Sequence, residues 1–245
     1  MKPSTRTIKS DRLFPKLTRI STMLRILLLL PAMSAVAKAD VLFGNYSLAA
    51  SPAEMEVSNS SITGGSSGFG KAICFTVGDN ALDIQSITLH LVVNTSNSTA
   101  VPTVTIWTIS SSGTLESRYA TFVTPAITTP SGSWQNIVFT ASGSVSLSAA
   151  TSYALVVTNS DSASTTIYWG AAATNNTTLL PTGVGATYLN MREGTGAPTG
   201  WNSAAVKYNG VQIDGTIVSQ VPEPASIALL LGAAGLAAVA CLRYK

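Results

Sequence analysis

Few side chains in this sequence are of the types that carry acid–base or metal chemistry. His90 is the sole histidine, which excludes a metal site built from clustered histidines. A Ser-His-Asp arrangement would have to use this one residue. Because His90 falls at a polar position of an alternating segment, we predict an exposed strand histidine, and a single triad remains the alternative.

Acidic residues are the second candidate for chemistry. Asp79 and Asp83 flank a predicted turn. Glu54 and Glu56 share another loop. Glycoside hydrolysis needs two carboxyl groups held about 5–9.5 Å apart, but a chain with many acids offers such pairs by chance. Loop carboxylates, among them Asp79, Asp83 or Asp214, are also the ligands that calcium prefers. We predict no catalytic residue, no metal site and no cofactor, with calcium as the open alternative.

Tryptophan rings could serve a binding function. Trp201 lies between Gly200 and Asn202 in a loop rich in glycine and proline, so we expect it to be exposed. A flat exposed ring can stack on a sugar, and Trp201 and Trp107 are therefore the speculative glycan contacts. The alternative is that large rings fill the core, as we expect for Trp134 and Trp169.

The elements that must position these residues are short strands. From Leu82 to Val93, the apolar residues Ile87, Leu89 and Leu91 alternate with polar ones, as in a half-buried strand. Similar short segments recur at roughly ten-residue spacing between turns rich in Gly, Ser and Asn. This pattern predicts an all-β fold, an antiparallel β-sandwich of jelly-roll or Greek-key type. Further strands are expected at 41–46, 72–77, 101–109, 118–123, 134–140, 145–157, 165–170, 187–191 and 206–218.

The first 39 residues have the parts of a secretory signal peptide. A long basic lead precedes an apolar core from Met23 to Ala37. Ala37 and Ala39 are small residues at the two positions that a signal peptidase reads. We predict cleavage after Ala39, and an uncleaved N-terminal anchor is the alternative.

The charges divide the chain in the same way. Residues 40–220 contain four cations and nine anions, which gives a net charge of −5, although the whole chain carries +3. The basic residues are concentrated at the two ends. The predicted exported part therefore lacks the basic surface that nucleic-acid binding needs, and we exclude nucleic acid as a partner. Cys74 is the only cysteine of this part. We predict a buried thiol and no disulfide.

The C-terminal segment has its own organisation. Pro222, Glu223 and Pro224 are followed by eighteen uncharged residues, 225–242, and then by the basic stop Arg243 and Lys245. Such a run is close to the length of a transmembrane helix, and the basic end is expected to stay cytoplasmic. The alternative is a buried C-terminal helix of the domain. We predict three parts: a signal peptide (1–39), an exported domain (40–220) and an anchor segment (221–245).

This tail resembles the PEP-CTERM sorting signal of Gram-negative bacteria. The resemblance covers Pro222-Glu223-Pro224, the apolar helix and the basic end, although many members carry a denser arginine cluster. It implies recognition by exosortase, a membrane transpeptidase-like enzyme found in bacteria that make exopolysaccharide. It also implies removal of the helix. The protein would cross the inner membrane, stay anchored by the helix until processing, and then reach the cell surface or the extracellular matrix.

The exported part more weakly resembles the choice-of-anchor β-domains found upstream of such signals. The segments that carry the resemblance are 82–91, 134–140, 145–157 and 168–170. That family brings no activity with it. Our leading hypothesis is a non-enzymatic surface or matrix protein associated with exopolysaccharide. The alternatives are a carbohydrate-binding module that uses exposed aromatic residues and, third, a glycan-active enzyme.

Overall fold

The computed structural model describes one part of the chain. The described residues are 39–46, 52–56, 58–64, 68–93, 100–125, 127, 132–161, 165–172, 176–204 and 207–218. The predicted tail, 221–245, lies outside them, as does the predicted signal peptide except for its last residue, Ala39. All described strands fall in the compact unit that runs from residue 38 to the C-terminus.

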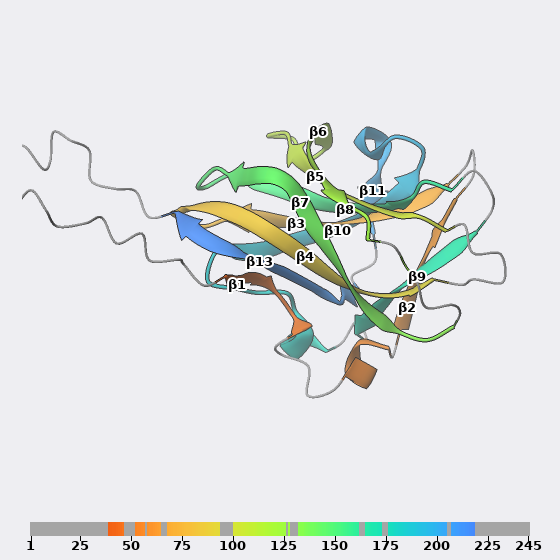
Figure 1. Ribbon diagram of the computed structural model, residues 1–245. Helices are drawn as coiled ribbons and strands as arrows, with labels where there is room; N and C mark the ends of the chain where they lie inside the picture. The colour runs from red at the N-terminus through yellow and green to blue at the C-terminus, as the bar shows by residue number, and fades with distance from the viewer. Residues whose placement is uncertain are drawn as a thin grey trace, which may run out of the picture. The chain divides into compact units, whose positions relative to one another are not determined.

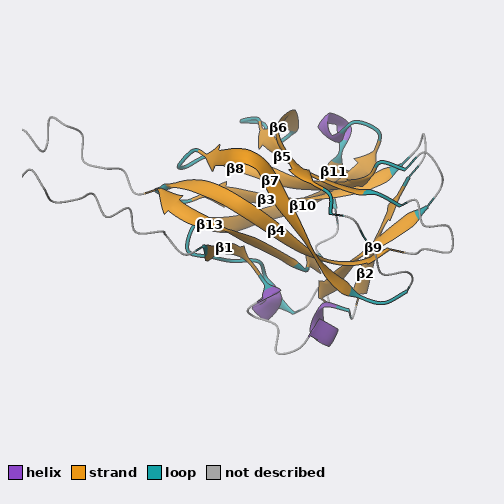
Figure 2. Ribbon diagram, viewed as in Figure 1, coloured by secondary structure: helices purple, strands orange, loops and turns teal. Residues whose placement is uncertain are grey.

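Thirteen strands form one antiparallel sheet that is strongly curled into a half-barrel (Figure 1). Along the main path the order is β1-β13-β4-β7-β6-β5-β8-β3-β10-β11. Off this path, β9 pairs with β4, and β2 and β12 pair with β9. The described helices are three short 3-10 turns, η2 (Pro52–Met55), η3 (Thr177–Leu179) and η4 (Pro198–Gly200) (Figure 2). The strands are β1 (Asp40–Gly44), β2 (Ser58–Thr63), β3 (Phe69–Val77), β4 (Ala81–Val93), β5 (Pro102–Ile109), β6 (Leu115–Val123), β7 (Gln135–Leu147), β8 (Ser152–Asn159), β9 (Thr166–Ala172), β10 (Ala186–Thr195), β11 (Asn202–Ser203), β12 (Tyr208–Asn209) and β13 (Val211–Val218).

The all-β antiparallel prediction is confirmed, whereas the finer prediction of a two-sheet sandwich is not. The reason lies in β4, which has 13 residues. One edge of β4 pairs first with β13, from Ala81 to Leu89, and then with β9, from Leu91 to Val93. Its other edge pairs with β7. Strands that would otherwise belong to separate sheets are therefore hydrogen-bonded into one.

A β-bulge keeps both halves of β4 directed at the same core. Leu82, Ile84, Ile87 and Leu89 are all buried in one apolar cluster, although a regular strand would place Ile84 and Ile87 on opposite faces. Against β13, Gln85 is the extra residue, since Ser86 stands opposite Asp214 and Ile84 opposite Gly215, and Gln85 is exposed. The inserted residue shifts the alternation of side chains by one position, so that Ile87 and Leu89 face the same core as Leu82 and Ile84.

Strands β3 and β8 are buried on both faces. Ile73 and Leu155 face the main core, and Cys74 and Val156 face a second apolar cluster on the other side of the sheet. Burial raises the pKa of the Cys74 thiol to about 11, and the nearby Arg192 opposes part of that shift. The prediction that Cys74 is a buried free thiol is confirmed.

The first strand is locked between distant parts of the chain. β1 pairs with β13, and its other edge exchanges backbone hydrogen bonds with the segment before β10, from Gly44 to Thr182 (2.8 Å) and from Gly185 to Leu42 (3.0 Å). Asn45 is fully buried, and its amide donates to the carbonyls of Leu179 and Asn209. These contacts fix the start of the domain against its end.

We predict that Gly215→Ala destabilises the exported chain by about 2–3 kcal/mol, because a Cβ at this position would lie 2.0 Å from the backbone oxygen of Asp83. The measurement is urea unfolding. Gly143→Ala is the matched control, since nothing lies within 4 Å of its Cβ, and we expect a change within about 0.5 kcal/mol. Equal effects of the two substitutions would contradict the close approach of β13 to β4.

Candidate functional site

The predicted sorting residues lie outside the described part of the chain. This holds for Pro222, Glu223 and Pro224, for the basic stop Arg243 and Lys245, and for Ala37 of the predicted cleavage site. Ala39 is described. It is exposed and stands outside any strand, directly before β1 begins at Asp40.

The expected exposure of Trp201 is wrong. Only 3% of its surface is accessible, because the ring packs over Ala72, Cys74 and Val156 in the outer cluster. Gly70 and Gly194 make room for it, since a Cβ on either residue would lie within 2.8 Å of the indole. The glycine and proline residues around Trp201 correctly indicated a loop. They did not indicate that this loop lies over the outer apolar cluster. Trp201 in this conformation offers no face to a sugar.

Trp107 is the glycan candidate that keeps some exposed surface. It lies on β5, packs at the margin of the outer cluster and is half-buried. Its Nε1 donates to Oγ1 of Thr105 at 2.9 Å. The ring is therefore held in one orientation.

The acidic residues do not assemble into a metal site within the described residues, where no group of three or more His, Cys, Asp and Glu side chains could hold an ion. Asp214 instead accepts hydrogen bonds from the Gln212 amide at 2.8 and 3.1 Å. Asp83 pairs with Thr216 across the β4–β13 ladder, and Asp79 is exposed in the turn between β3 and β4.

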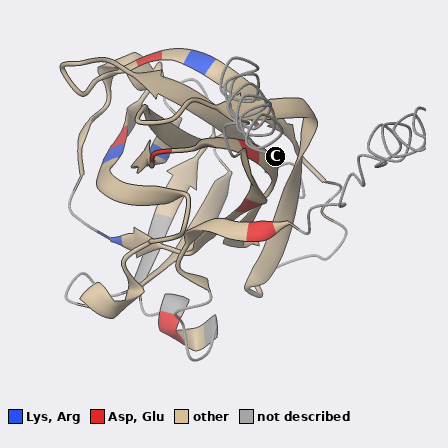
Figure 3. Cartoon of the chain, turned by 90° about the vertical axis from the view of Figure 1, so that its left-hand side faces the viewer, with Lys and Arg blue, Asp and Glu red and all other residues tan. Residues whose placement is uncertain are grey.

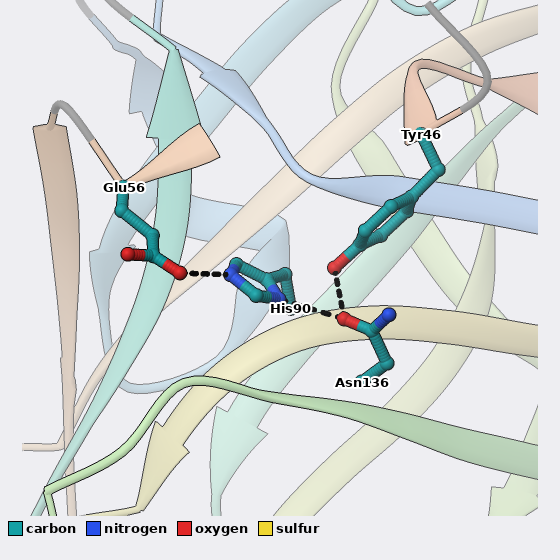
Figure 4. Close-up of polar contacts among 4 residues, drawn as sticks. All are labelled: Tyr46, Glu56, His90 and Asn136. Carbon is teal, nitrogen blue, oxygen red and sulfur yellow. Dashed lines mark hydrogen bonds and ion pairs between the residues drawn. The ribbon is translucent and has the colours of Figure 1, made fainter. Parts of the chain in front are cut away.

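The prediction of an exposed His90 is also wrong. Its surface is 3% accessible, because Trp134 stacks on the imidazole with centroids 5.1 Å apart and Tyr46 covers it edge-on at 5.8 Å. Figure 4 shows the polar partners of the ring. Nδ1 lies 2.7 Å from Oδ1 of Asn136, and Nε2 lies 3.1 Å from Oε1 of Glu56.

This His90 cluster (Tyr46, Glu56, His90, Trp134 and Asn136) is linked by hydrogen bonds and ring contacts. Oδ1 of Asn136 accepts from the Tyr46 hydroxyl at 2.8 Å. Both ring nitrogens of His90 therefore lie within hydrogen-bond distance of an oxygen atom. Burial, and then the neighbouring Glu56 carboxylate, raise the pKa of Tyr46 far above its usual value, so its hydroxyl remains a donor.

The cluster connects separate parts of the fold. Tyr46 and Glu56 belong to the connection between β1 and β2, whereas His90 lies on β4 and Asn136 on β7. Residues 64–68 match the Gly-x-Ser-x-Gly pattern of a nucleophile elbow. They lie between two strands, β2 and β3, and no helix follows them directly. The nucleophile elbow requires a turn from a strand into a helix.

Sequence reasoning named His90, Glu56 and Trp134 separately and missed Tyr46 and Asn136. Asn136 stands opposite His90 in the β4–β7 register. An alternation pattern shows which face a residue takes in its own strand, but it does not give the register between strands. The sequence signal that could have pointed to Asn136 is its place two residues after Trp134, at the start of a predicted strand.

The C-terminal residues identify the sorting signal of this chain. Residues 220–245 match the model of the PEP-CTERM protein-sorting motif. The chain carries a PEP-CTERM sorting signal. This signal implies an exported protein that exosortase processes and sorts to the cell surface. Comparisons with curated proteins and with solved structures find no match.

The predicted membrane helix was also compared with the structure. Within the described residues, no helix is long and apolar enough to cross a membrane. The segment predicted to do so, 225–242, is not among them.

We predict that Asn136→Ala destabilises the exported chain by about 1–3 kcal/mol, because it removes the oxygen that contacts the buried His90 ring and the half-buried Tyr46 hydroxyl. Tyr46→Phe added to Asn136→Ala should cost less than Tyr46→Phe alone, since the hydroxyl has already lost its partner. Urea unfolding of the two single variants and the double variant measures this coupling.

Thr140→Ala is the control, because Thr140 is an exposed residue of the same strand. Its effect should stay within about 0.5 kcal/mol. Strictly additive effects of Asn136→Ala and Tyr46→Phe would show that the cluster is not connected as described.

Proposed function

We propose that this chain is a non-enzymatic surface or extracellular-matrix protein that associates with exopolysaccharide. In this proposal the signal peptide is removed after Ala39, the helix 225–242 anchors the chain in the inner membrane, and exosortase processes it at Pro222-Glu223-Pro224. The curled β domain is the part that remains on display. The PEP-CTERM motif at 220–245 is the observation that carries the proposal.

Three features of the domain support a displayed, non-catalytic role. Its formal charge is sparse and mildly acidic, with four cations and nine anions in residues 40–220. Its sole histidine is buried, and both ring nitrogens lie against side chains of the same domain, Asn136 and Glu56. Its strands begin one residue after the proposed signal cleavage and end at Val218, just before the motif.

A carbohydrate-binding function is the second candidate. The half-buried, hydrogen-bonded indole of Trp107 favours it, because a fixed ring stacks on a sugar with little loss of conformational entropy. Under this proposal Trp107 replaces Trp201 as the main contact.

We predict that the mature C-terminus lies before residue 225 in cells with exosortase and at Lys245 in cells without it. Mass spectrometry of the purified chain reads both ends. Glu223→Ala should keep residues 225–245 even when the enzyme is present. Glu116→Ala, which changes an exposed glutamate of β6, should be processed normally. A C-terminus at Lys245 under all conditions would leave this segment as a plain anchor.

For the second candidate, we expect a polysaccharide ligand on a glycan panel and a five- to tenfold loss of affinity in Trp107→Ala, as expected for a stacking contact of about 1 kcal/mol. Tyr119→Ala is the control, because it removes an aromatic ring that is 47% exposed and contacts Tyr153 of the main core, whereas Trp107 packs against the outer cluster. Unchanged affinity in Trp107→Ala would remove this residue from the binding site, and no binding at all would exclude the carbohydrate-binding module.

A further inference from the structure

We propose that the end of the domain from which the tail leaves is a docking surface for the exosortase that acts on the tail. The inference rests on the proposed processing at Pro222-Glu223-Pro224 and adds a second contact to it. The surface, here called the tail-side surface, consists of Val184, Ile217 and Val218 with the turn 78–80.

The chain length between the sheet and the motif carries the first step. β13 ends at Val218, and three residues separate it from Pro222. Four residue steps span at most about 14 Å when fully extended. An enzyme that holds Pro222-Glu223-Pro224 must therefore approach the end of β13 to within the width of a few side chains.

Three exposed apolar side chains lie at this end of the sheet. Val184 is 74% exposed, and Ile217 and Val218 are each 38% exposed. Val184 and Ile217 line the same small hollow of about 20 Å³, together with Gly78, Asp79, Asn80, Leu82 and Gly185. Exposed apolar side chains around a hollow are typical of interaction sites.

Carboxylates surround this patch and favour a protein over a lipid surface. Asp40 pairs with Gly215 and Asp83 with Thr216, both within three residues of Val218, and Asp79 lines the hollow itself. Figure 3 views the domain from this side and shows several acidic segments. Anionic lipids repel carboxylates. A partner with an apolar contact and a cationic margin fits the tail-side surface.

Docking at this surface would act through effective concentration. A weak contact next to the motif raises the local concentration of the motif at the enzyme's active site, and the gain falls as the linker lengthens. Because the linker has only three residues, even a small apolar contact raises the local concentration of the motif at the active site.

The first experiment identifies the occupant. A photo-crosslinking benzoylphenylalanine replaces Val184 in the full chain, in cells that contain exosortase. We expect an adduct with exosortase, and none when the probe replaces Val138, which is 46% exposed on β7. An adduct with lipid or with a second copy of this chain, or no adduct at all, would overturn the proposal.

The second experiment measures the consequence. Val184→Asp should slow processing of the full chain about tenfold in a pulse–chase experiment, and Val138→Asp should leave the rate unchanged. Ten Gly/Ser residues inserted after Ser219 should slow processing to a similar extent and remove the sensitivity to Val184→Asp. A normal rate in Val184→Asp, or faster processing with the spacer, would overturn docking. Absence of processing in the unaltered chain would instead contradict the proposed function.

Discussion

The pairing of β1 with β13 is the interaction on which the rest of the arrangement depends. Asp40 stands opposite Gly215 and Gly44 opposite Gln212, so the strands run antiparallel and the start of one lies beside the end of the other. Leu42 and Phe43 of β1 are buried in the core. The first and last strands are therefore part of one packed unit, and both flanking segments of the chain leave from the same end of the sheet.

Two kinds of burial stabilise the unit. On the core side, apolar residues from nearly every long strand meet in one cluster, which the bulge at Gln85 keeps continuous. Away from this core, a second apolar cluster packs beneath Trp201, and polar contacts from Glu56 and Asn136 hold His90 against Trp134. Because buried polar groups are costly unless they are paired, the cluster around His90 specifies how the β1–β2 connection lies on the sheet.

The sequence allowed a good prediction of what is local. The alternation of Ile87, Leu89 and Leu91 predicted their burial, and the short strands predicted an antiparallel all-β chain. Cys74 was expected to be buried, and it is. The predicted sorting signal is confirmed by a family match that covers twenty-six residues, 220–245.

What the sequence did not reveal depends on contacts between distant segments. Trp201 and His90 both sit where local composition predicts exposure, and both are covered by residues far away in the chain. The single curled sheet depends on β4 sharing one edge between β13 and β9, which no pattern within β4 encodes. The predicted exposure of Trp201 and His90 was therefore wrong because packing between distant segments, and not local sequence, sets their burial.

The most direct test of this account is the distance between the two ends of the domain. Spin labels at Asp40→Cys and Val218→Cys, in a chain with Cys241→Ser, can be measured by double electron–electron resonance. Three residues of offset along paired strands predict a Cα separation of roughly 11 Å and a correspondingly short distance between the labels. A separation above about 25 Å, the length of an eight-residue strand, would contradict the β1–β13 pairing and the common exit of the two flanking segments.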